Sequence, residues 1–132
     1  MKVLVVFGSP RKDGNTKNLL IGFLSGLPRD TMVEIVYAYD LNPSPCTACG
    51  YCTVADGCSK KDLEAFWGKF READVIVFAT PIYNYTFPAP LKAIFDRFQR
   101  YYNARFVRNI ENSFPKERKA VLLVTSGCDG KM

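Results

Sequence analysis

The amino-acid sequence predicts a single α/β domain built on a doubly wound parallel sheet. Short apolar runs rich in β-branched residues alternate along the chain with segments of helical periodicity. Continuous apolar runs are typical of strands buried on both faces of a parallel sheet. The alternation of strand and helix indicates crossover connections, and the length of 132 residues suits one compact domain.

The first half of the chain predicts two strands and one helix. Residues 3–7 form a buried-type strand that ends at Gly8-Ser9-Pro10. A helical pattern begins after Asn15-Thr16 and closes near Gly26. Residues 32–39 are predicted to form the second strand, and residues 40–60, which contain four cysteines, an irregular Cys-rich loop.

The second half predicts two helices and two strands. Ser59 and Asp62 resemble a capping box for a helix with an apolar face from Leu63 to Phe70. Residues 75–79 form a third strand, and a Pro-punctuated loop over 80–90 leads into one long helix. The apolar face of this helix is predicted to carry Leu91, Ile94, Phe95 and Phe98. Its polar face is predicted to carry Asp96, Arg97 and Arg100.

Residues 120–125 predict a fourth strand, again of the type that is buried on both faces. Such a strand requires a neighbour and a covering helix, but only seven residues follow Thr125. Two explanations are open: the chain is a truncated form, or another subunit covers this edge. We therefore expect a homo-oligomer, a dimer or a tetramer.

Composition excludes several classes of chemistry. The sequence contains no His, so Ser-His-Asp triads, Cys-His nucleophiles and two-His zinc sites are excluded. The net charge of +5 is concentrated in residues 92–119. A solvated helix face is the simplest interpretation, and an acidic protein partner or a phosphorylated dinucleotide is the alternative. Nucleic acid is not expected, because the known binding signatures are missing.

No apolar run suits a signal peptide or a membrane span, so a cytoplasmic protein is expected. In a reducing compartment, clustered cysteines more often bind metal or carry out redox chemistry than form disulfides. Four of the five cysteines, Cys46, Cys49, Cys52 and Cys58, have the spacing C-x2-C-x2-C-x5-C. An iron–sulfur cluster, a zinc ion and free thiols all remain open. Cys128 lies outside this motif and is expected to be a small buried residue.

The loop between the first strand and the first helix has the composition of a phosphate-binding site. Ser9, Arg11, Asn15 and Thr16 supply donors beside a helix N-terminus at the carboxyl end of a strand. The spacing matches neither the Walker A motif nor G-x-G-x-x-G. A polar turn with an Asn or Thr helix cap is the structural alternative.

Three segments resemble those of the flavodoxin-like, NAD(P)H-dependent FMN reductases, and within them the iron–sulfur flavoproteins. They are GSPRKDGNT, PIYNYTFPAPLKAIFDR and the Cys-rich loop. The resemblance implies strand order 2-1-3-4 without the family's final strand and helix, a single FMN-binding domain over residues 1–132, and FMN as cofactor. It further implies phosphate contacts from the loop residues just named and a [4Fe-4S] cluster on the four cysteines.

The same resemblance places the isoalloxazine ring against the loop after the third strand, and the geometry of the parallel sheet adds the loop after the fourth strand. In the order 2-1-3-4, these loops lie near the switch point where the ligand crevice opens. The residues expected there are Pro81, Ile82, Tyr83, Asn84, Ser126 and Gly127. A purely structural cover for the end of the sheet is the alternative for the tyrosines.

The resulting hypothesis is an FMN-dependent oxidoreductase that takes electrons from a nicotinamide cofactor or a ferredoxin. No catalytic residue is assigned, because flavin chemistry belongs to the cofactor. A flavodoxin-type electron carrier without a substrate of its own is the first alternative, and a zinc-stabilised interaction module is the second.

Overall fold

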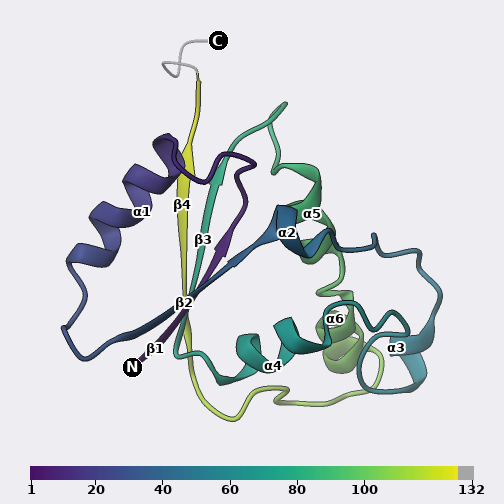
Figure 1. Cartoon of the computed structure of the whole chain (residues 1–132). Coiled ribbons are helices and arrows are strands. Elements are labelled where there is room, and N and C mark those ends of the chain that lie inside the picture. Colours follow the sequence, from purple (N-terminus) through teal and green to yellow (C-terminus); the bar gives the residue numbers. More distant parts are fainter. Residues whose placement is uncertain (128–132) are drawn as a thin grey trace.

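A computed structural model describes residues 1–127 as a sheet with helices on both faces (Figure 1). The strands are β1 (Lys2–Phe7), β2 (Met32–Tyr37), β3 (Val75–Pro81) and β4 (Lys119–Thr125). The helices are α1 (Asn15–Ser25), α2 (Ala38–Leu41), α3 (Tyr51–Val54), α4 (Glu64–Glu72), α5 (Ala89–Asp96) and α6 (Gln99–Phe106). The predicted role of Cys128 lies outside the described residues.

All strand pairs are parallel and the order is β2-β1-β3-β4, which confirms the predicted flavodoxin-like fold. Val5 in β1 lies opposite Ile35 of β2 and Val77 of β3, and Val77 lies opposite Val121 of β4. The carboxyl ends of the strands therefore lie at the same edge of the sheet, where α1 begins.

Two apolar clusters explain why β1 and β3 read as continuous hydrophobic runs. Alternate residues of β1, including Val5 and Phe7, pack with Leu20 of α1 on one face. The others, including Leu4, pack with Phe66 of α4 and further aromatic side chains on the opposite face. Both strands are thus covered on both faces, as the sequence predicted.

The prediction of one long helix after residue 90 is wrong. Helix α5 ends at Asp96, Arg97 occupies its C-cap, and α6 begins only at Gln99. Arg97 was predicted on the polar face, but it is 1% exposed. The guanidinium points into the molecule because acceptors from a distant loop meet it there.

The capping box and the second strand also differ from expectation. Helix α4 begins at Glu64, its N-cap is Leu63, and no side chain caps it. Asp62 instead accepts the backbone N–H of Ser44 at 2.8 Å. Strand β2 ends at Tyr37, because the chain turns there into the short helix α2.

Strand β4 is not buried on both faces, contrary to prediction. Val121 and Leu123 pack on the α1 side of the sheet. On the other side, Leu122 is 54% and Val124 39% exposed. Within residues 1–127, no helix has the length and apolar character needed to cross a membrane.

Candidate functional site

A cavity of about 250 Å³ opens at the carboxyl ends of β1, β3 and β4, beside the start of α1. Nine of the ten residues predicted to contact FMN border it: Ser9, Arg11, Asn15, Thr16, Pro81, Ile82, Tyr83, Ser126 and Gly127. Ligand pockets are usually about 300–1,000 Å³. This cavity therefore suits one part of a larger ligand, such as its phosphate arm and one edge of its ring.

The first wall of this cavity is the loop from Gly8 to Gly14. The backbone N–H of Gly8 donates to the Ala79 carbonyl at 2.8 Å, which joins the loop to β3. The buried Ser9 hydroxyl accepts the N–H of Arg11 at 3.1 Å. Because a hydroxyl both accepts and donates, its proton remains available for a phosphate oxygen.

Helix α1 starts without the Asn or Thr side-chain cap that the sequence suggested as an alternative. Its N-cap is Gly14, and no side-chain hydrogen bond caps the helix. The first N–H groups of a helix have no partner inside the helix, and they carry the positive end of its dipole. Because Asn15 and Thr16 border the cavity, these donors lie where an anion would bind.

Thr16 connects this helix to the far side of the cavity. Its side chain is buried, and its hydroxyl lies 2.9 Å from the hydroxyl of Thr125 at the end of β4. The Thr125 carbonyl also accepts the N–H of Ile82 at 2.9 Å. Thr125, which borders the cavity, was missed from the sequence, although its place at the end of a predicted strand was a usable signal.

The structure does not bring Asn84 to the cavity. Tyr83 and Thr86 exchange backbone hydrogen bonds of 2.8 and 3.1 Å, so residues 83–86 form a tight turn. Asn84 and Tyr85 occupy its two central positions with φ of 50° and 66°. A turn with two positive φ angles favours Asn or Gly at its centre, which is a structural reason for the residue type at 84.

A second and larger cavity, of about 620 Å³, is bordered by all four clustered cysteines. Its opposite wall comes from the α5–α6 region, including Arg97, Arg100 and Asn103. Helix α3, which lies within the Cys-rich loop, packs against α6 (Figure 1). All four cysteines are free thiols.

The four cysteines border this cavity without forming a site for a single metal ion. Among residues 1–127, no three Cys, Asp or Glu side chains are close enough together to hold one metal ion. The sulfurs nevertheless have polar partners. Asn103 Nδ2 donates to the Cys52 Sγ at 3.1 Å, and Arg97 Nη2 lies 3.7 Å from the Cys58 Sγ.

The Cys49 thiol has a hydrogen-bond partner of its own within the Cys-rich loop. Its Sγ lies 3.1 Å from the hydroxyl of Ser59, so this serine bonds a thiol where the sequence predicted a helix cap. The hydrogen bond with Ser59, followed by backbone bonding at Tyr51, lowers the pKa of the Cys49 thiol. A thiol held toward its thiolate form is better prepared to bind metal.

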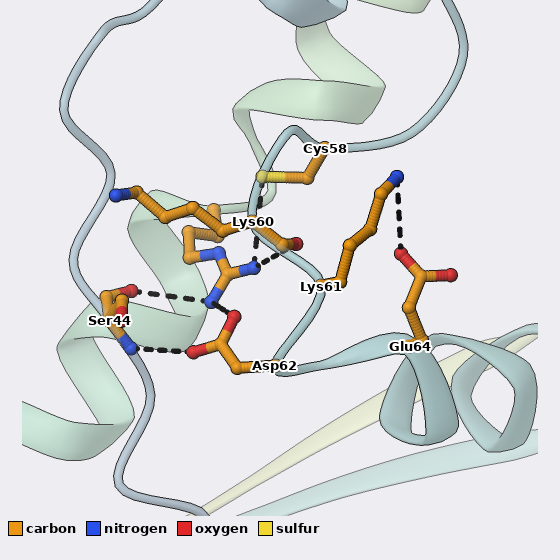
Figure 2. A network of polar contacts seen from close by, with 7 residues as sticks. Ser44, Cys58, Lys60, Lys61, Asp62 and Glu64 are labelled. Atoms are coloured by element: carbon orange, nitrogen blue, oxygen red, sulfur yellow. Dashed lines mark hydrogen bonds and ion pairs between the residues drawn. The ribbon is translucent and has the colours of Figure 1, made fainter.

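Arg97 is the centre of a polar network at the base of the Cys-rich loop. Figure 2 shows Ser44, Cys58, Lys60 and Asp62, which take part in it. Arg97 Nη1 lies 2.6 Å from Asp62 Oδ1, and Nη2 donates to the Lys60 carbonyl at 2.9 Å. Burial raises the pKa of Asp62, but the bonds from Ser44 N–H and Arg97 outweigh this effect, and the net pKa is lowered. Asp62 is therefore a carboxylate at neutral pH, as its partners require.

The fold and the first cavity define a flavodoxin-like domain with a ligand crevice at the switch point of its sheet. The chain belongs to the NADPH-dependent FMN reductase family, whose model matches residues 1–131.

Its relatives agree with this assignment. The chain is 36% identical over 99 residues to an iron-sulfur flavoprotein of Methanosarcina thermophila, covering 74% of this chain and 52% of the relative. It is 31% identical over 103 residues to an iron-sulfur flavoprotein of Archaeoglobus fulgidus, covering 76% and 47%. The chain thus spans about half the length of these curated relatives.

A similar solved structure supports the fold. An azoreductase from Bacillus anthracis superposes with a TM-score of 0.71 at 21% identity, covering 96% of this chain and 69% of that structure.

Proposed function

We propose that this chain binds FMN in the cavity beside α1 and acts as an FMN-dependent oxidoreductase. The observation that carries the proposal is the convergence of three sequence-distant loops on that cavity, at the switch point of a sheet of this family. When bound, FMN supplies hydride and single-electron chemistry. The chain's own residues supply binding and orientation.

The residues in the first wall suit a phosphate. Ser9 offers a hydroxyl proton, Arg11 a guanidinium and the first turn of α1 its N–H groups. The loop after β3 also borders the cavity, and its residues offer apolar surface and backbone groups for an isoalloxazine ring. These residues are Pro81, Ile82 and Tyr83. No catalytic residue is assigned in this proposal.

We further propose that Cys46, Cys49, Cys52 and Cys58 bind a [4Fe-4S] cluster, which supplies one-electron transfer. Cysteine thiolates are the usual ligands of such a cluster, and four cysteines with free thiols border one cavity here. An amide and a guanidinium are directed at two of the sulfurs. Four cysteines with repeated x2 spacing within residues 46–58 suit a group of several atoms better than a single zinc ion, whose two C-x2-C arms are usually separated by a long gap. The relatives carry the name iron-sulfur flavoprotein, which supports the same choice.

The electron donor is proposed to be NAD(P)H or a ferredoxin, and the assembly a homo-oligomer. NAD(P)H fits the family. A ferredoxin is the second candidate donor, because the net positive charge of the chain is concentrated in residues 92–119 and an acidic protein would be attracted to it. Within residues 1–127, β4 lies at one edge of the sheet with Leu122 and Val124 exposed, and such an edge favours pairing with another chain.

The test is anaerobic purification followed by three measurements on the full chain. FMN binding is followed by flavin fluorescence, iron and sulfide are quantified, and NADH or NADPH oxidation is measured with excess free flavin or quinone. We expect one FMN and about four irons per chain, with nucleotide oxidation above the rate without protein. Replacing Cys49 with Ser should lower the iron content while FMN binding persists.

The outcomes separate the hypotheses. FMN binding without nucleotide oxidation would favour the flavodoxin-type electron carrier. Iron near zero after reconstitution, with the thiols still titratable, would reject the cluster and leave a plain FMN reductase. Zinc without a flavin spectrum would reject both proposals.

A further inference from the structure

The Cys-rich loop is fastened at its base by one buried arginine. The Arg97 side chain has 0% exposed surface, and its guanidinium meets both ends of the loop. At one end lies the Ser44 carbonyl, 3.3 Å from Nη1, and at the other lie Lys60 and Asp62. Asp62 also accepts the N–H of Ser44, so the two ends are joined directly (Figure 2).

A guanidinium suits this position because its planar fork donates in several directions at once. A lysine at 97 would keep the charge but would not reach these separate acceptors. A fully buried cation is also costly unless it is paired and hydrogen-bonded. The acceptors of the loop pair both Nη atoms of Arg97, and only its Nε has no hydrogen-bond partner among the described residues, so the guanidinium and the loop stabilise each other's position.

A second set of contacts fastens the middle of the loop. Asn103 of α6 is buried and donates from Nδ2 to the Cys52 sulfur at 3.1 Å. Arg108, just after α6, donates from Nε to the Cys52 carbonyl at 3.1 Å. Cys52 is thus held through its side chain and its backbone by the same region of the chain.

Arg97 and Asn103 also share a chemical property: each directs an N–H at a cysteine sulfur, Cys58 and Cys52 respectively. Hydrogen bonds to cysteine sulfur are one of the factors that set the reduction potential of an iron–sulfur cluster. Reduction adds one electron to the cluster and its thiolates. A donor directed at that sulfur stabilises the added negative charge and makes the potential less negative.

We propose that Arg97 and Asn103 are positioning residues that hold the Cys-rich loop in place before any metal binds and, through Cys58 and Cys52, raise the reduction potential of the cluster. The second half of this proposal rests on the proposed [4Fe-4S] function, whereas the first half does not.

The first test is hydrogen exchange on the full chain freed of metal. In Arg97→Lys, amides of residues 44–62 should exchange about ten- to a hundredfold faster, the factor expected when a hydrogen bond to a charged group is lost. Amides of β1 and β3 should keep their protection. Arg105→Gln is the matched control, because Arg105 is exposed on the same helix as Asn103.

If Arg97→Lys fails to fold, Asp62→Asn tests the same network. The Asp62 side chain is 33% exposed, and replacing the carboxylate with an amide of the same shape creates no cavity. Unchanged exchange over residues 44–62 in the folded variant would overturn the positioning role.

The second test is the potential of the iron-loaded protein, titrated with dithionite as the electron source. Asn103→Ala should have a more negative potential than the parent, and Arg105→Gln should not differ from it. A residue that only holds the loop in place would leave the reduction potential unchanged when it is replaced. An unchanged potential in Asn103→Ala would therefore refute the effect of Asn103 on the potential. If the parent takes up no iron, the cluster proposal fails together with the electronic role, and hydrogen exchange alone decides the positioning role.

Discussion

Replacing Gly8 with Ala is expected to destabilise the domain and to weaken FMN binding. Gly8 lies where β1 turns into the proposed phosphate loop. A Cβ atom added there would lie 2.7 Å from the Leu91 Cδ2 and 2.8 Å from the Thr80 Oγ1. Both neighbours are fully buried, so neither can move without displacing core atoms.

The expected loss of stability in Gly8→Ala follows from overpacking of the core. Inserting a methyl group into a well-packed core costs about 1–3 kcal/mol. The effect on FMN follows from Thr80, whose hydroxyl donates to the Pro81 carbonyl at 2.8 Å. Displacing Thr80 moves the first residue of the flavin loop, and the FMN dissociation constant should rise in the folded variant.

Urea unfolding measures the first effect, and Gly22→Ala is the matched control. Gly22 is exposed inside α1, and an added Cβ would meet nothing within 4 Å. The same substitution there should stabilise the protein by about 0.5–1 kcal/mol, because Ala favours the helix. If Gly8→Ala were as stable as the parent, or shifted in the same direction as Gly22→Ala, the close approach of the β1 turn to α5 would be refuted.

Three further predictions concern the phosphate loop, acid stability and assembly. Arg11→Ala should raise the FMN dissociation constant roughly tenfold with unchanged urea stability, because Arg11 is exposed; equal affinity would remove it from the phosphate site. The hydrogen bond from Lys116, followed by that from the Lys2 N–H, lowers the pKa of Asp74. Asp74 therefore stabilises the fold above its unfolded pKa of about 4, and this stability is lost as the pH falls through the lower folded pKa. The stability difference between the parent and Asp74→Asn should be largest at neutral pH and shrink toward pH 3 in urea titrations, and a constant difference would contradict the assignment. Sedimentation at micromolar concentration should show at least a dimer, and a single 14.9 kDa species would exclude that assembly.

The sequence by itself determined the positions of the four strands along the chain and the parallel sheet. A central parallel strand is covered on both faces, so β1 and β3 must be apolar at nearly every position, and that pattern is visible locally. The sequence also placed polar donors directly before α1, because a loop at the carboxyl end of β1 has a predictable location once the sheet is parallel. The exposed face of β4 was not predictable in this way, since the apolar run of β4 does not record what covers it.

Only the tertiary structure decided which residues hold the Cys-rich loop. Helical periodicity separates an apolar face from a polar one, and it therefore placed Arg97 toward solvent. The buried guanidinium depends on acceptors at Ser44, Lys60 and Asp62, which are 35 to 53 residues away along the chain. No local pattern contains that information, because a side chain is buried or exposed according to what folds against it, and here the partner is a loop with no regular repeat.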